Sequence, residues 1–135
     1  MKKKNKITTA KLKGILEPIF NHFIRLRDKG KPCISCGKVK TLQAGHYYSV
    51  KMADAFRFDE RNVHGECAGC NCLNQDHLIL YTKNIEIKLG KEELEDLHYE
   101  VSKYKRNRNS LKYKWYRHEL EEKIIYYKAK VLEYL

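Results

Sequence analysis

The sequence predicts a small α+β protein in which a four-cysteine site fastens two short strands between helices. Three observations predict this class: two Cys-x2-Cys pairs, two strand-like segments between them, and several segments with apolar residues at helical spacing. At 135 residues the chain has room for one domain with a modest core, and hardly for two. We expect a basic N-terminal arm over residues 1–17 and a single domain over 18–135, whose C-terminal helical extension starts near residue 89.

The expected elements follow one another in the order helix, strand, strand, helix, helix, helix. Residues 18–30 form an amphipathic pattern, with Pro18 suited to a first helical turn and Gly30 to a helix end. The predicted strands are 42–50 and 61–67. The predicted later helices begin with a short one over 69–81 and continue with 89–105. In the final helix apolar residues recur at helical spacing, as expected of a core or subunit contact: Leu120, Ile124, Tyr127 and Val131.

The net charge of +11 indicates a polyanionic partner. Nucleic acid is favoured over a membrane surface, because no segment combines this charge with a strong apolar face. No apolar run approaches the roughly 20 residues that span a bilayer, and no apolar stretch of a signal peptide follows the basic start. The expected location is therefore the cytosol, although charge runs are also common on ordinary solvated surfaces.

Two thiol pairs, Cys33 with Cys36 and Cys67 with Cys70, have the spacing of a structural zinc site. Each pair turns two sulfurs toward one ion, and four thiolates complete a tetrahedron without an open position for chemistry. A redox dithiol is the alternative, but it needs a parallel βαβ context that the sequence lacks. The fifth cysteine, Cys72, is expected to be a small buried side chain.

A second group of polar residues remains once the zinc ligands are set aside: His46, Asn62, His64 and Asn71. The strand assignment places His46 in the first strand, Asn62 at the start of the second and Asn71 at the start of the following helix. This arrangement would bring a histidine and a helix N-terminus to one side of a ββα unit, which favours phosphate binding. Asn62 as a turn former, Asn71 as a helix cap and His46 as a surface histidine are the structural alternatives.

The order Cys-x2-Cys-Gly, Gly-His, and Asn before Cys-x2-Cys-Asn resembles that of the HNH nucleases, the ββα-metal group. The resemblance implies that His46 is the general base that activates water. It also implies that Asn62 holds a loop and orients the histidine, and that Asn71 binds the catalytic divalent metal, Mg²⁺ or Mn²⁺. Phosphodiester hydrolysis needs a base with a pKa near 7 and a cation to offset the developing charge, so these residue types suit it.

Longer segments extend the resemblance over about residues 18–135. FIRLRDKGKPCISCG, AGHYYS, RFDERNVHGECAGCN and the closing EL-x3-I-x-YYKAKV are similar to the phage NinG/Rap family of recombination nucleases. This implies metal-dependent, structure-selective cleavage of branched DNA, such as Holliday junctions and D-loops, by a phage protein acting in the bacterial host cell. The alternatives are a generic HNH nicking or restriction-like endonuclease, a non-catalytic zinc-stapled DNA-binding module, and an RNA-processing nuclease.

One position departs from the wider HNH pattern. Many HNH enzymes carry a metal-binding aspartate just before the base histidine, and this chain has Gly45 there. His64 is the first choice for the missing ligand, with a buried structural role as an equal alternative. Further candidates for that ligand are Glu66, Asp59 and Asp54.

The segment after Asn71 contains fewer candidate metal ligands. Gln75 occupies a place where some relatives use a second histidine, and His77 is not expected to bind the ion.

DNA binding is predicted mainly for the segment KYKRNRNSLKYKWYR (103–117), where cations would contact phosphates and aromatic rings would stack on unpaired bases. The predicted DNA-binding residues are Arg57, Arg61, Lys105, Arg106, Arg108, Lys112, Lys114 and Trp115. Two alternatives remain: the first two arginines pair with Asp59 and Glu60, and Trp115 anchors the last helix. Because a four-way junction has approximate two-fold symmetry, a homodimer joined through the C-terminal helix is expected.

Overall fold

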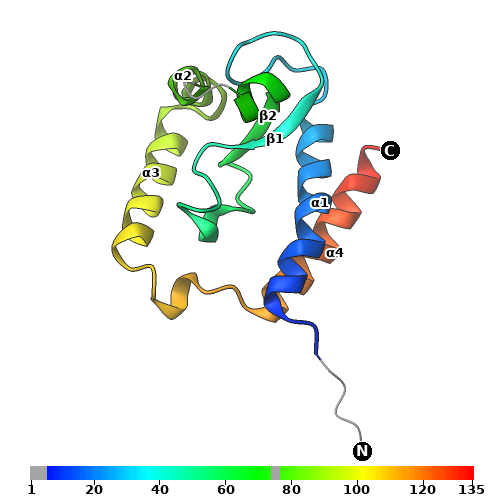
Figure 1. Ribbon diagram of the computed structural model, residues 1–135, viewed down its shortest axis with the longest axis vertical. Coiled ribbons are helices and arrows are strands. Elements are labelled where there is room, and N and C mark those ends of the chain that lie inside the picture. Colours follow the sequence, from blue (N-terminus) through cyan, green and yellow to red (C-terminus); the bar gives the residue numbers. More distant parts are fainter. Residues whose placement is uncertain (1–5, 74–76) are drawn as a thin grey trace, which may run out of the picture.

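The computed structural model describes residues 6–73 and 77–135, in which helices surround a two-stranded antiparallel sheet (Figure 1). The elements are α1 (Thr9–Arg27), β1 (Leu42–His46), the 3₁₀ turn η1 (Asp54–Phe56), β2 (Val63–Cys67), the π-helical turn η2 (Gly69–Leu73), α2 (His77–Leu89), α3 (Lys91–Arg106), the 3₁₀ turn η3 (Leu111–Tyr113) and α4 (Arg117–Glu133). The predicted α+β class is confirmed. Among the described residues, no helix has the length and apolar character needed to cross a membrane.

Helix α1 begins nine residues before the predicted residue 18. Its apolar stripe continues toward the N-terminus through Leu12 and Leu16, which are both buried, so the segment gains core packing that its lysines obscure in the sequence. Pro18 consequently lies inside the helix rather than in its first turn. The arm predicted over 1–17 is therefore wrong for its second half, and residues 1–5 lie outside the described residues.

The two strands pair in a register that sets His46 opposite Val63, and both strands are shorter than predicted. Side chains alternate between the two faces of a sheet, so paired residues share a face. Ala44 and Val63 pack against the α1 cluster, which places His46 on the α1 face. The opposite face looks toward α2 and carries Gln43, Gly45, His64 and Glu66.

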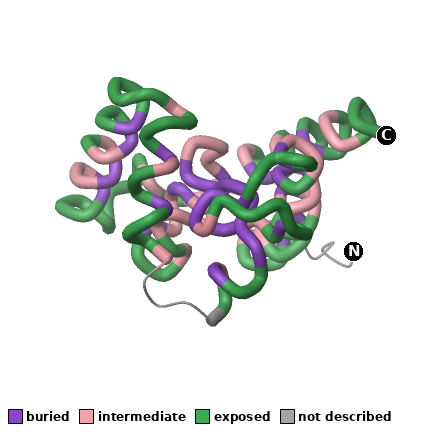
Figure 2. Tube along the Cα trace, turned by 90° about the horizontal axis from the view of Figure 1, so that it is seen from above, coloured by how far each residue is buried: buried purple, intermediate pink, exposed green. Residues whose placement is uncertain are grey.

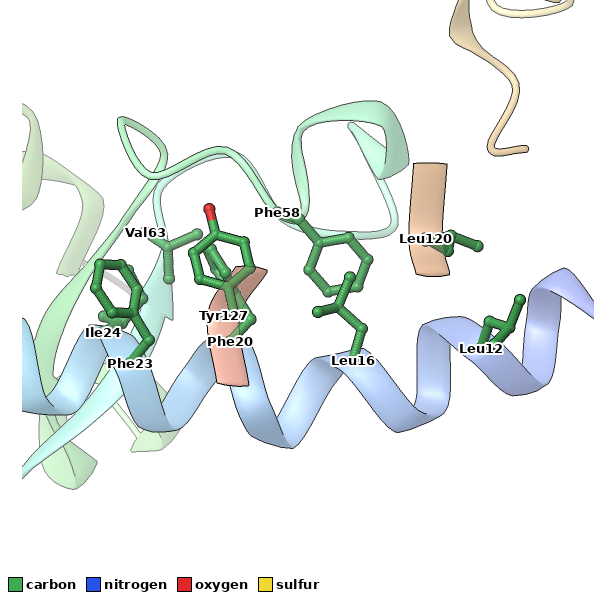
Figure 3. Packing of buried hydrophobic residues seen from close by; sticks show 9 residues of the cluster. All are labelled: Leu12, Leu16, Phe20, Phe23, Ile24, Phe58, Val63, Leu120 and Tyr127. Atoms are coloured by element: carbon green, nitrogen blue, oxygen red, sulfur yellow. The ribbon is translucent and has the colours of Figure 1, made fainter. Parts of the chain in front are cut away.

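Two hydrophobic clusters flank the sheet and form the purple centre of Figure 2. The first joins α1, β2 and α4 (Figure 3) and comprises Leu12, Leu16, Phe20, Phe23, Ile24, Phe58, Val63, Leu120 and Tyr127. The second joins α2 and α3 to the loop after β1 and comprises Ile34, Ala53, Phe56, Tyr81, Ile85, Leu94, Leu97, Val101 and Tyr104. The apolar stripe predicted for the final helix is confirmed as core, because its members bury against or pack onto the first cluster.

Helices α2 and α3 follow each other with a sharp break at Gly90, whose φ of 87° is favourable only for glycine. Of the short helix predicted over 69–81, residues 69–73 form the π-helical turn η2 and residues 77–81 belong to α2, which runs on to Leu89, while residues 74–76 lie outside the described residues. The helix predicted over 89–105 is confirmed to within two residues as α3.

A buried carboxylate, Asp28, connects the end of α1 to β2 and α2. Its oxygens accept hydrogen bonds from the Arg27 guanidinium at 2.9 Å, the Lys88 ammonium at 2.9 Å and the Gly65 backbone N–H at 2.8 Å. Burial opposes ionisation, but the two cations outweigh it and hold the pKa of Asp28 well below its usual range. This network fixes the sheet against both neighbouring helices and so positions the residues described next.

Candidate metal centre and active site

The four predicted cysteines converge. The Sγ atoms of Cys33, Cys36, Cys67 and Cys70 all lie within 4.8 Å of one another, which fits a tetrahedral ion such as zinc. The first pair sits in a tight turn that closes with a 2.9 Å hydrogen bond from Gly37 N–H to the Cys33 carbonyl, and Gly37 has φ 74°. Backbone N–H groups of Cys36 and Cys67 point at the Cys33 sulfur. These residues can therefore hold one metal ion through four thiolates.

Proton release must accompany metal binding at this centre. Burial raises the pKa of the Cys33 and Cys70 thiols, whereas the Cys70 backbone N–H and neighbouring sulfurs lower the pKa of Cys67. A zinc ion binds thiolates, so it displaces the protons that burial favours. The affinity of the centre for zinc is therefore expected to fall in acid.

Two residues that follow the second cysteine pair differ from their predicted positions. Cys72 is exposed rather than buried, because η2 turns its side chain outward, toward the Gln43 side-chain oxygen at 3.5 Å. Asn71 is half-buried and donates from Nδ2 to the same Gln43 oxygen at 2.9 Å. Asn71 lies within the π-helical turn and on the α2 face, so the structure does not bring it onto the face that carries His46.

His46 ends β1 and is held by one backbone group. Its Nε2 lies 2.9 Å from the Arg57 carbonyl oxygen, an acceptor, so Nε2 carries the proton and Nδ1 keeps its lone pair. Burial lowers the pKa of His46 below its usual value, and the Arg57 hydrogen bond partly offsets this. A half-buried neutral imidazole with a fixed tautomer is suited to accept a proton.

Asn62 is fully buried and joins the two ends of the loop that follows β1. Its Oδ1 accepts from the Tyr48 N–H at 2.8 Å, and its Nδ2 donates to the Tyr48 carbonyl at 3.0 Å and the Phe56 carbonyl at 3.1 Å. The loop so closed includes Arg57, one residue beyond Phe56. By closing this loop as a turn former, Asn62 also positions the Arg57 carbonyl that binds His46.

His64 has no nitrogen left for a cation. It is 1% exposed, its Nε2–H donates to the Arg61 carbonyl at 2.7 Å, and its Nδ1 accepts from the Arg27 guanidinium at 3.3 Å. Burial, helped by the positive charge of Lys88, lowers the pKa of His64 to about 3. Strand alternation turns His64 into the α2 interface, so its geometry agrees with the buried structural role given as the alternative and not with that of a metal ligand.

The predicted arginines and two of the alternative acids neutralise one another. Arg61 contacts Asp59 at 2.6 Å and Glu100 at 2.5 Å, and Arg57 contacts Asp54 at 3.1 Å. The alternative that these arginines pair with Asp59 and Glu60 therefore holds for Arg61, which pairs with Asp59. Arg57 pairs with Asp54 instead. Neither Asp54 nor Asp59 is free to act as a metal ligand without releasing its arginine.

Glu66 and His77 form a pair that the sequence does not reveal. Glu66 is fully buried, and its Oε2 lies 2.7 Å from His77 Nδ1 and accepts a hydrogen bond from the Ser35 hydroxyl. The two residues come from β2 and the first turn of α2, so only the folded chain joins them. The single sequence signal is Gly45, since its missing side chain leaves the space that Glu66 occupies. Gln75 lies outside the described residues.

A cationic cavity of about 410 Å³ opens where the start of α1, η1 and the segment before α4 meet. Its lining includes the cations Lys13, Arg108 and Lys114 and the rings of Tyr104, Tyr113 and Trp115. Trp115 also packs on the first cluster and donates from Nε1 to the Asp54 carbonyl at 3.1 Å, so it anchors the segment before α4. The other predicted DNA-binding cations, Lys105, Arg106 and Lys112, are exposed.

Comparison with known proteins places the sequence of this chain in a family. The family described as "Bacteriophage Lambda NinG protein" matches residues 1–134. "Protein ninG" of Escherichia phage lambda is 39% identical over 79 residues, and that of Escherichia phage 933W is 40% identical over 79 residues. Each alignment covers 57% of this chain and only 39% of the relative.

"Protein ninG" of Salmonella phage P22 is 43% identical over 72 residues, which cover 52% of this chain and 36% of that protein. No solved structure matches the chain. Because the family match extends over nearly every residue, the chain belongs to the NinG family of bacteriophage lambda and its relatives.

Proposed function

We propose that this protein is a metal-dependent endonuclease of the HNH (ββα-metal) type that hydrolyses phosphodiester bonds in branched DNA. The observation that carries the proposal is the hydrogen bond from His46 Nε2 to the Arg57 carbonyl, which leaves Nδ1 as a proton acceptor. A protein that only binds DNA has no need for a histidine fixed in this way. The zinc centre has a structural role, because four thiolates leave the ion no open position.

The hydrogen bonds that hold the His46 imidazole favour its role as a general base. Asn62 closes the loop, the loop presents the Arg57 carbonyl, and that carbonyl fixes the imidazole. The lowered pKa keeps the imidazole neutral at pH 7 and therefore ready to take a proton from water. Proton transfer of this kind accelerates reactions by roughly 10²–10⁴-fold.

The proposed reaction also uses a divalent cation, Mg²⁺ or Mn²⁺, which when bound offsets negative charge on the phosphate and the leaving oxygen. Of the two ligands expected from sequence, Asn71 fits, because its half-buried amide still has an oxygen to offer. His64 does not fit, since both of its nitrogens are engaged. At least one further ligand must therefore come from elsewhere in the chain.

Charge and shape support DNA as the substrate, and branched DNA in particular. The cationic cavity adjoins the loop that holds His46, because Asp54 lines it and pairs with Arg57. Its aromatic rings offer stacking surfaces for bases that lack a partner at a branch point. The net charge of +11 adds affinity for phosphate that does not depend on sequence.

The direct test compares wild type with His46→Ala on a labelled four-way junction and on the matching linear duplex, with Mg²⁺ or Mn²⁺. We expect the variant to cut the junction 10²–10⁴-fold more slowly while its binding, measured by gel shift, is retained. His118→Ala is the matched control, since His118 is an exposed histidine on α4, and its rate should equal that of wild type.

Each rival function has its own outcome in this experiment. Equal cutting of junction and duplex by wild type would indicate a generic HNH endonuclease. Cleavage of a structured RNA in preference to either DNA would indicate an RNA-processing enzyme. Tight binding without cleavage under any metal would indicate a DNA-binding module and contradict the proposal.

A homodimer is proposed because a four-way junction presents two equivalent cleavage sites. The outer face of α4 supports this, since it exposes large apolar side chains, including Ile125 at 71% and Leu132 at 70%. Sedimentation equilibrium should give a dimer for wild type and a monomer for the double variant Ile125→Lys/Leu132→Lys. A wild-type monomer at high concentration would contradict the dimer without bearing on cleavage.

A further inference from the structure

The pairing of Glu66 with His77 has the geometry of a histidine prepared to bind a metal. Metal-binding histidines characteristically donate one ring N–H to a carboxylate, which fixes the tautomer and directs the other nitrogen at the ion. Here Glu66 Oε2 lies 2.7 Å from Nδ1 of His77. The proton therefore resides on Nδ1, and Nε2, on the far side of the ring, presents a lone pair.

The two side chains differ in solvent exposure, as expected of a buried carboxylate that orients a metal-binding histidine. The Glu66 side chain is fully buried, whereas that of His77 is 18% exposed. A carboxylate enclosed by protein is held rigidly, and a partly exposed ring at the start of α2 can be reached from solvent. Asn71 lies on the same α2 face of the sheet and offers an amide oxygen from η2.

Glu66 is difficult to explain by stability alone. Its Oε1 is buried without a hydrogen-bond partner among the described residues. In the part of the chain that the structure describes, neither lysine nor arginine pairs with it, whereas the other buried acid, Asp28, has both. A buried acid with such incomplete pairing destabilises the fold relative to an apolar residue of similar size, so its presence points to a function.

Gly45 makes room for this acid. A Cβ atom at residue 45 would lie 2.5 Å from Glu66 Oε1 and 2.8 Å from Glu66 Cβ. Gly45 and Glu66 therefore fit each other, and a carboxylate attached to β2 occupies the position where a side chain of β1 would project. That position immediately precedes His46 on β1, about 3.3 Å along the strand.

We propose that Glu66 and His77 form a carboxylate–histidine pair that binds a divalent cation, with His77 as the ligand through Nε2 and Glu66 as the residue that positions it. This inference rests on the proposed function, for which it supplies the ligand that His64 does not provide. Because Mg²⁺ and Mn²⁺ favour oxygen ligands, the Asn71 amide oxygen, water and phosphate oxygens would complete the set around the one imidazole.

Binding of Mn²⁺ to the zinc-loaded full chain tests the pair without reference to cleavage. Electron paramagnetic resonance of free Mn²⁺ should give one site per chain in wild type. His77→Ala should weaken that site at least 10-fold, and Glu66→Gln, which keeps the shape and removes the charge, should weaken it 10–100-fold. His118→Ala is the matched control and should bind as wild type does.

A second measurement locates the ion. Bound Mn²⁺ should broaden the imidazole NMR signals of His77 strongly and those of His118 hardly at all. Zinc content and thermal unfolding of each variant show whether it is folded. A folded His77→Ala or Glu66→Gln protein that binds Mn²⁺ as tightly as wild type would overturn the inference, as would a wild type with no Mn²⁺ site. Junction cleavage that persists in such a variant and is lost in His46→Ala would leave the proposed function standing.

Discussion

Replacing Gly45 by alanine places a methyl group where Glu66 already lies. The new Cβ would be 2.5 Å from Glu66 Oε1, 2.8 Å from Glu66 Cβ and 3.3 Å from Glu66 Cδ. The carboxylate can rotate away, but Glu66 Cβ is fixed to β2 and cannot. Relief therefore requires either separation of the strands or loss of the Ser35 and His77 hydrogen bonds.

The size of the effect follows from these two routes. Overpacking of a well-ordered interior costs about 1–3 kcal/mol, and hydrogen bonds to a charged group contribute about 1.5–3 kcal/mol. We expect Gly45→Ala to lower the free energy of unfolding by about 2–4 kcal/mol. In a Glu66→Gly background the obstructing atoms are absent, and the same substitution should be neutral or stabilise by about 0.4–1 kcal/mol through the unfolded chain.

Urea denaturation of the zinc-loaded wild type, both single variants and the double variant gives the coupling energy directly. A coupling of about 2 kcal/mol or more is expected. Gly14→Ala serves as the control, since a Cβ there meets nothing within 4 Å and should stabilise α1 by up to about 1 kcal/mol in either background. If the cost of Gly45→Ala stays the same with and without Glu66, the steric account is refuted.

Three further predictions concern the zinc centre, the buried histidine and the loop. Cys67→Ser should lose the bound zinc and most of its helical circular dichroism, whereas Cys72→Ser, at an exposed position, should retain one zinc per chain by elemental analysis. Because the folded pKa of His64 is about 3 and the unfolded value 6.5, the folded state resists protonation, and stability present above pH 6.5 is lost as pH falls from 6.5 toward 3. Wild type should therefore lose about 1.4 kcal/mol per pH unit more than His64→Gln, and equal pH slopes in urea denaturation would contradict the assignment. Asn62→Ala leaves the backbone N–H and carbonyl of Tyr48 without partners and removes one of the two hydrogen bonds to the Phe56 carbonyl. It should lower the free energy of unfolding by about 3 kcal/mol, which thermal unfolding would check.

The sequence predicts best those features that depend on local spacing. The Cys-x2-Cys pairs specify their own turns, so all four sulfurs were placed correctly. The stripe of α4 and that of α3 emerge from periodicity for the same reason. The start of α1 was missed because lysines interrupt its apolar stripe, and only the contact with α4 shows that Leu12 and Leu16 are core.

Features that depend on contacts between distant residues could not be predicted. His64 and His46 look equivalent in the sequence, and it is the strand register that turns them to opposite faces. The partners of Asp28 lie in β2 and α2, far along the chain. Glu66 and His77 meet only because α2 packs on the sheet, so no sequence spacing predicts their pairing.

The contact between α1 and α4 also constrains how the protein can be made. Among the described elements α1 is synthesised first and α4 last, at roughly 5–20 residues per second. The apolar face of α1 that holds Phe20 and Phe23 therefore waits several seconds on the ribosome before Tyr127 can cover it. The four-cysteine centre and the second cluster can close earlier in translation. During that interval α1 could accept α4 from a neighbouring nascent chain, so exchange of this helix between copies is the misassembly to which the fold is most exposed.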